Sequence, residues 1–217
     1  MIRSFHKYLS LTISIQLLLW TISGIYFAFN KIELIRGEQY LLEQKTSELR
    51  LDELRNTFNA NNLTILKRLD EWIIKVEDNS GVYYTDLKGN KLISLTSEQA
   101  KLAVKEQTSL IPVNVTRITS SSKGSEFRGR ELPLFKVTTS SEEEVNVYVD
   151  AVSGEVKAIR SDSWRLWDLL WGLHIMDYSE RENIDNFLLK VFSILALISA
   201  LSGIALFFFG LKKRNSL

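Results

Sequence analysis

The chain of 217 residues contains no cysteine and only two histidines. Without cysteine it can have no disulfide framework, no thiolate metal site and no cysteine nucleophile. Serines are abundant, but apart from His6 near the N-terminus the only histidine is His174, so a Ser-His-Asp triad is excluded on composition. A net charge of +1 without a clustered basic face argues against nucleic acid as a partner. The sequence predicts no catalytic residue and no metal site.

Long apolar segments are present near both termini. The first, Leu9 to Phe29, has 21 residues and no charge, and at about 1.5 Å per residue it matches a hydrocarbon core of roughly 30 Å. The second, Phe187 to Leu211, is interrupted only by Lys190, whose stem can reach the membrane interface. We expect two transmembrane helices. The first lacks the small-x-small cleavage pattern of a signal peptide and is expected to remain as an anchor.

The charges beside these segments predict their orientation. Both tails, 1–8 and 212–217, carry basic residues and no acidic residue. The positive-inside rule therefore predicts that both termini are cytoplasmic. The connecting stretch 30–186 holds all 26 acidic residues against 21 basic ones, a net charge of −5. We expect this stretch on the extracytoplasmic side.

The sequence pattern of the connecting stretch predicts two halves, each with one helix and a small antiparallel sheet. This arrangement belongs to the α+β class. The first half, 30–95, begins with a stalk and a helix over Leu51 to Ala60. The second half, 96–160, begins with a helix capped by Thr96 or Ser97 and contains a polar loop over 120–130. Alternating apolar residues and turn signals predict the strands: 64–69, 72–77, 82–87, 113–119, 134–139, 145–150 and 156–159.

Each half ends in a strand followed by a similar turn. The segments 84–92 and 148–156 both place an aspartate before a glycine, with one residue less in the first turn. We expect Asp86 and Asp150 to cap these turns with their side chains, and Gly89 and Gly154 to supply the positive φ that other residues avoid.

These segments carry a family resemblance. Val147 to Val156 resembles the closing strand pair of PepSY domains, and Tyr84 to Leu92 looks like a degenerate second copy. The flanks are similar to the PepSY-associated transmembrane family in the following segments: Arg3 to Leu11, Thr21 to Ile25, Leu173-His174 and Ser202-Gly203-Ile204. The resemblance implies an exported α+β module that binds or restrains a partner, such as a protease or another protein.

Larger members of this family look like iron-siderophore reductases that hold haem between histidines, and His6 and His174 occupy matching positions. The resemblance therefore implies that both are axial haem ligands. This chain has fewer membrane helices and histidines than those relatives, and its two histidines are expected roughly 30 Å apart, on opposite sides of the membrane. A haem would then need a second ligand from another subunit or another residue type. The alternative interpretation is that neither histidine binds haem: His6 is a polar residue of the cytoplasmic flank, and His174 lies at the membrane interface.

The linker 161–186 concentrates tryptophan. Its aromatic residues fall on one helical face: Trp164, Trp167, Trp171, His174 and Tyr178. Two interpretations remain open. The face rests at the membrane surface, where indole rings prefer the headgroup level, or it is a docking interface for a partner helix or a lid over a cofactor.

Small residues within the apolar segments predict close helix packing. Ser199 and Gly203 form a small-xxx-small face, and Gly24 lies near the outer end of the first segment. We expect the two helices either to pack on each other or to pack on another subunit in an oligomer. Because the helices run in opposite directions, Gly24 and Gly203 are expected at different depths.

The preferred function is a binding, regulatory or assembly module held at a bacterial inner membrane. Its extracytoplasmic sheet edges would contact a protein partner by strand addition, without catalysis and without a cofactor. The first alternative is a haem-binding accessory protein for electron transfer or iron uptake. The second is an accessory subunit of a larger membrane complex.

Overall fold

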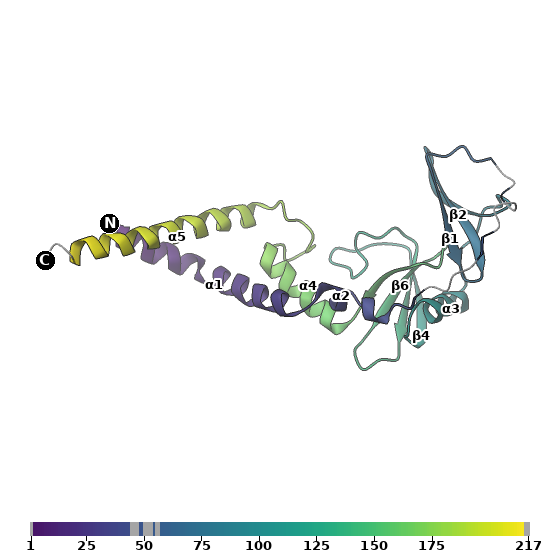
Figure 1. Cartoon of the computed structure of the whole chain (residues 1–217), viewed down its shortest axis with the longest axis horizontal. Coiled ribbons are helices and arrows are strands. Elements are labelled where there is room, and N and C mark those ends of the chain that lie inside the picture. Colours follow the sequence, from purple (N-terminus) through teal and green to yellow (C-terminus); the bar gives the residue numbers. More distant parts are fainter. Residues whose placement is uncertain (1, 44–47, 50–53, 55–56, 215–217) are drawn as a thin grey trace. The chain divides into compact units, whose positions relative to one another are not determined.

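The computed structural model describes residues 2–43, 48–49, 54 and 57–214 (Figure 1). Contacts divide the chain into two compact units. One contains Met1–Lys31 and Leu166–Leu217, and the other contains Ile32–Arg165. The first unit is helical, and the second is an α+β unit with two antiparallel sheets. The predicted α+β class is confirmed at this level.

The first unit is built on two long helices, α1 (Ile2–Phe29) and α5 (Phe187–Arg214). Ile2–Phe29 and Phe187–Phe209 are long and apolar enough to cross a membrane. Most of their large apolar side chains are exposed, which suits a hydrocarbon surrounding better than water. Figure 1 shows the first turns of α1 beside the last turns of α5. The two predicted apolar helices are confirmed as helices of sufficient length.

The helix α4 (Asp162–Ile175) precedes α5 and ends earlier than the aromatic pattern predicted. Met176 adopts a left-handed conformation with φ of 57°, which stops the helix. The Asp177 carboxylate then accepts the backbone N–H groups of Glu180 and Asn183 at 3.1 and 3.0 Å, closing a loop. Tyr178 therefore lies in this loop, and its predicted place on the helical face is wrong.

The first sheet of the second unit contains β1 (Asn62–Arg68), β2 (Glu71–Asp78) and β3 (Gly81–Asp86) in the order β1-β2-β3. A short turn joins β2 to β3, because Asp78 Oδ1 accepts the N–H groups of Ser80 and Gly81 at 2.7 and 3.1 Å. Before this sheet lie two short helices, α2 (Ile32–Ile35) and η1 (Glu38–Tyr40). All three predicted strands of this half are confirmed.

The second sheet has the order β4-β5-β6-β7 and is covered by α3 (Ser97–Gln107). Its strands agree closely with the predicted ones: β4 (Pro112–Ile118), β5 (Leu134–Thr139), β6 (Asn146–Asp150) and β7 (Val156–Arg160). The core lies between α3 and the sheet and includes Ala103, Val137 and Val147, none of which is exposed.

The start of α3 follows from a capping box. The Thr96 side chain accepts the N–H of Gln99 at 3.2 Å, and the Gln99 side chain accepts the N–H of Thr96 at 2.9 Å. Of the two predicted caps, the structure selects Thr96.

The two halves are less alike than the repeat predicted. Half of the helix predicted over Leu51 to Ala60 falls outside the described residues, and its described half, Leu54 and residues 57–60, is not helical. The sheets differ in size, with three strands in the first and four in the second.

Candidate functional site

His6 lies at the contact between α1 and α5. Its Nδ1 is 2.8 Å from Ser202 Oγ, and one turn further along α1, Ser10 Oγ is 2.9 Å from Ser199 Oγ. A Cβ added to Gly203 would lie 3.1 Å from His6 Cε1, so only glycine leaves this much room for the imidazole. Ser199 and Gly203 thus face α1, and His6 fills the space beside them.

Gly24 lies apart from this contact. A Cβ added to Gly24 would meet no other atom within 4 Å among the described residues. Gly24 and Gly203 therefore do not pack on each other in this chain, and Gly24 leaves an open position on α1.

His174 lies in the last turn of α4 and contacts α1 at Ser23. Its Nδ1 is 2.7 Å from Ser23 Oγ, and Ser23 Oγ itself donates to Leu19 O at 2.8 Å. This contact holds the imidazole of His174 against α1.

The aromatic face of α4 packs on α1. Trp167 and Trp171 are stacked with centroids 5.5 Å apart, and Phe27 lies 5.5 Å from Trp167. Side chains of α1 also satisfy the last carbonyls of α4, since Gln16 donates to Leu173 O at 3.1 Å and Trp20 donates to His174 O at 2.6 Å. Trp167, Trp171 and His174 therefore contribute to contacts within the chain.

The geometry does not fit a haem shared by the two histidines. His6 lies on α1, whereas His174 contacts Ser23, seventeen residues further along the same helix. At 1.5 Å per residue this separation is about 25 Å. Two axial ligands of one iron must flank the same metal atom. The described residues also contain no group of three or more His, Cys, Asp or Glu that could hold a metal ion.

The aspartate turns close the strand ends in both halves. Asp86 Oδ1 accepts the N–H groups of Lys88 and Asn90 at 2.9 and 2.8 Å, and Gly89 has φ of 86°. In the second half, Asp150 Oδ1 accepts the N–H groups of Val152 and Ser153 at 2.9 and 2.7 Å, and Gly154 has φ of 75°. These residues shape turns, and the second turn forms one wall of a cleft.

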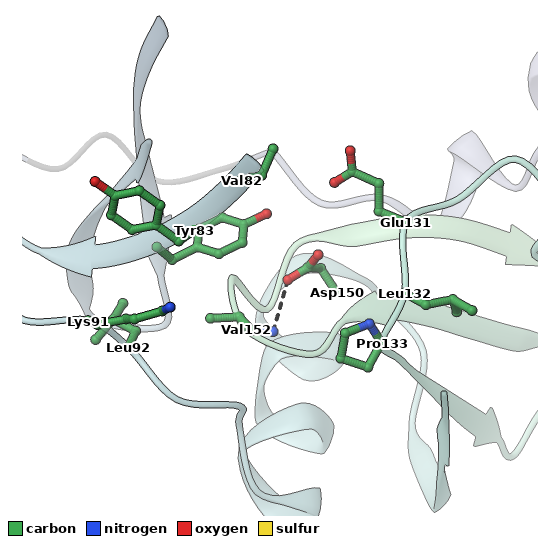
Figure 2. A pocket seen from close by; sticks show the side chains of 10 residues that line it. Val82, Tyr83, Lys91, Leu92, Glu131, Leu132, Pro133, Asp150 and Val152 are labelled. Carbon is green, nitrogen blue, oxygen red and sulfur yellow. Dashed lines mark hydrogen bonds between the residues drawn. The ribbon is translucent and has the colours of Figure 1, made fainter. Parts of the chain in front are cut away.

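The cleft has a volume of about 440 Å³ and lies between the two sheets of the second unit (Figure 2). Its walls are β3 with Lys91 on one side, and the segment 131–133 with the Asp150 turn on the other. Figure 2 shows Asp150 between the Lys91 side chain and Pro133. The Lys91 ammonium also lies 5.8 Å from the centroid of the Tyr83 ring. The cleft therefore presents aromatic, cationic and acidic groups together.

One backbone position of β3 opens into this cleft. The outer edge of β3 is covered by the following segment, because Leu92 N–H donates to Tyr84 O at 2.8 Å and Asp86 N–H donates to Asn90 O at 3.0 Å. Backbone groups alternate in direction along an antiparallel strand, so those of Val82 point to the same side as those of Tyr84. Val82 is exposed and lines the cleft. Among the described residues, none covers this end of the edge.

The loop 120–130, predicted only as polar, is tied to the second sheet by Glu126. Tyr148 donates to its carboxylate at 2.7 Å, Arg165 Nε donates to it at 2.6 Å, and Arg160 Nε donates to its backbone carbonyl at 2.9 Å. Burial raises the pKa of the Glu126 carboxyl, but the hydrogen bonds from Arg165 and Tyr148 more than offset this, so its pKa lies below the usual value. Sequence analysis missed this residue.

Trp164, predicted as a contact residue, is only 7 % exposed. The Arg160 guanidinium lies 4.3 Å from the centroid of its ring, and the Arg128 guanidinium lies 5.5 Å from it. Burial, followed by the charges of Arg130 and Arg128, lowers the pKa of Arg160 to about 10. Arg160 therefore remains charged at neutral pH, and the nearby charge of Glu126 favours this charged form.

Comparisons with known proteins give no family for the chain. No family model matches it, and neither the curated proteins nor the solved structures contain a match. The resemblance to PepSY proteins therefore remains a prediction.

Proposed function

We propose that the protein is a membrane-anchored binding module, whose second unit lies outside the cytoplasm and captures a protein partner in the cleft beside Val82. The two long apolar helices and the basic, acid-free tails support this topology. We also propose that both termini lie in the cytoplasm and that the membrane is a bacterial inner membrane, as the resemblance to PepSY proteins implies.

The observation that carries this proposal is the uncovered backbone edge at Val82. An extended segment of a partner can continue the pairing that Leu92 begins, because the N–H and C=O of Val82 point outward. The added strand would then run along a wall lined by Tyr83 and Lys91 and facing Glu131. Backbone hydrogen bonds would supply affinity, and these side chains would select the partner.

The chemistry of the cleft favours binding over catalysis. Tyrosine provides large contact area with little loss of conformational entropy, and Lys91 with Glu131 offers charges of both signs to a peptide. The sequence supplies neither cysteine nor a histidine within 30–165 that could activate a nucleophile.

The test is site-specific photo-crosslinking in native membranes, with a photoreactive phenylalanine analogue at Tyr83. We expect one discrete adduct. Val82→Pro should abolish it, because proline removes the outward N–H without breaking the ladder to β2. Val82→Thr, which keeps the N–H and the side-chain shape, should retain it.

Two outcomes would contradict the proposal. One is an adduct that Val82→Pro leaves at the same yield. The other is an identical adduct from the same analogue placed at Leu102, an exposed residue of α3 that does not line the cleft.

A further inference from the structure

The helix α4 has three faces with different surroundings. Its aromatic face lies on α1, where the rings of Trp167 and Phe27 have centroids 5.5 Å apart. A second face lies under the loop that follows the helix, because Arg181 packs closely on Gly172. The third face is opposite the aromatic one and consists of leucines spaced three and four residues apart. We call this face the leucine ridge: Leu166, Leu169 and Leu173.

The leucine ridge is exposed, whereas the acidic residue of the same part of α4 is hidden. Leu166 and Leu169 are each 47 % exposed. Asp168 is the only acidic residue of 166–175, a stretch without lysine or arginine, and it is 1 % exposed. Arg181 Nη1 donates to Asp168 Oδ2 at 2.7 Å. A helix that faces water exposes its charges and buries its leucines, so the opposite pattern indicates an apolar surrounding.

The end of α4 lies beside the apolar part of α1. Gln16 donates to Leu173 O at 3.1 Å, and Trp20 donates to His174 O at 2.6 Å. Both donors belong to the helix Ile2–Phe29, which is long and apolar enough to cross a membrane. Where α1 enters a membrane, these hydrogen bonds hold the end of α4 next to it. The leucine ridge then adjoins the exposed apolar surface of α1.

We propose that the leucine ridge contacts lipid at the outer boundary between headgroups and acyl chains. The inference rests on the proposed function, because it requires α1 to cross the membrane with its last turns on the extracytoplasmic side. Lipid is the occupant that this surface fits, since acyl chains accept exposed leucines and already surround the neighbouring surface of α1. Membrane contact thus falls on the face opposite the tryptophans.

The length and the charges of this region suit insertion into one leaflet only. The helix α4 has 14 residues, about 21 Å at 1.5 Å per residue, which is too short for a hydrocarbon core of roughly 30 Å. Its residue 167 contacts Phe27 and its residue 173 contacts Gln16, so Leu173 lies deeper than Leu166. The loop after α4 turns back, because Arg181 reaches Asp168, and this ion pair therefore lies toward the headgroups.

The experiment measures how often a nitroxide label collides with oxygen, which enters hydrocarbon, and with an uncharged nickel chelate, which stays in water. The full chain is reconstituted in vesicles of phosphatidylcholine and phosphatidylglycerol. Because the chain has no cysteine, Leu166→Cys, Leu169→Cys and Leu173→Cys are each labelled singly, and three positions keep the test valid if one replacement disturbs folding. Leu102→Cys is the matched control, since Leu102 is a leucine of α3 that is 42 % exposed. Ile15→Cys, at a position of α1 that is 74 % exposed, reports full lipid contact.

We expect the ratio of oxygen to nickel collisions to be several-fold higher at Leu169 than at Leu102. The ratio should also rise from Leu166 through Leu169 to Leu173, toward the value at Ile15, because α4 descends into the leaflet. Equal ratios at Leu169 and Leu102, with Ile15 in lipid, would overturn the lipid contact and leave the proposed topology intact. Few collisions with either reagent along the ridge would overturn it in favour of a covering protein. A water-like ratio at Ile15 would overturn the membrane-crossing α1 and this proposal with it.

Discussion

The two sheets of the second unit have similar sequence patterns and different environments. The β4–β7 sheet carries α3 across one face, and the buried core of the unit lies between them. No described residue of the β1–β3 sheet belongs to that core. Ile73, Ile74 and Val76 of its central strand are buried, whereas Leu63, Ile65 and Val82 of its outer strands are exposed. Alternation of apolar residues therefore identifies a strand, but the neighbouring elements decide how much of the strand is buried.

The difference extends to the polar groups of the two sheets. The Glu126 network ties the loop before β5 to β6 and β7. In the β1–β3 sheet, Thr85 Oγ1 is buried and has no hydrogen-bond partner among the described residues. We infer that the β4–β7 sheet is the stable part of the unit and the β1–β3 sheet the adaptable part, which suits an edge that receives a partner.

Removal of a core side chain from β5 should have the largest effect. Phe135 is 4 % exposed, so Phe135→Ala should lower the free energy of unfolding by about 3–5 kcal/mol through lost burial and a residual cavity. A change at an exposed position of the other sheet, Leu63→Ala, removes a side chain that is 47 % exposed and should cost less than about 0.5 kcal/mol. Denaturant unfolding of the purified chain measures both. Equal costs would remove the distinction between the sheets.

Loss of the Glu126 charge should have a smaller, pH-dependent effect. The pKa of Glu126 is lowered in the folded state, so its contribution is present above the usual value of about 4.5 and is lost as the pH falls through the lowered pKa. Glu126→Gln should therefore cost about 1–2 kcal/mol at neutral pH, and the difference from wild type should shrink in acid. Unfolding at several pH values tests this. A difference that is constant with pH would contradict an ionic role.

The smallest effects concern two threonines in opposite situations. Thr85→Val should raise the free energy of unfolding by about 1 kcal/mol, because it removes a buried hydroxyl without a partner. Thr108 Oγ1 donates to Val104 O at 2.8 Å and accepts Leu110 N–H at 3.2 Å, so Thr108→Val should lower it by about 1 kcal/mol. Thermal unfolding of the two variants gives the signs. The same sign for both would show that Thr85 is satisfied.

The sequence predicts the elements well where the signals are local. The seven strands follow from period-two alternation and from turns such as Asp78 to Gly81, and the long helices follow from uninterrupted apolar runs. The predicted cap of α3 depends on residues three apart, Thr96 and Gln99. In each case the determining contacts lie within a few residues.

Contacts between distant residues could not be predicted in this way. Glu126 meets Tyr148, Arg160 and Arg165, which lie 22 to 39 residues further along the chain. The only sequence signal was a dense run of charges from Glu126 to Glu131 after a serine-rich stretch. The aromatic periodicity of α4 was visible, but nothing local indicated that Ser23 would form a hydrogen bond with His174.

The end of α4 shows a further limit of periodicity. The aromatic spacing continues to Tyr178, although the backbone turns at Met176. A hydrophobic pattern does not indicate that a residue other than glycine, here Met176, will adopt positive φ. It also does not indicate that the next residue, Asp177, will close a loop with its carboxylate.

The most direct test of a binding module outside the cytoplasm is its topology in intact cells. The chain has no cysteine, so a single introduced thiol gives no background. Glu142→Cys places a thiol in an exposed loop of the second unit, and Ser4→Cys places one near the start of α1. A membrane-impermeant maleimide should label the first variant in intact cells and the second only after permeabilisation. Labelling of Ser4→Cys but not Glu142→Cys in intact cells would contradict the account.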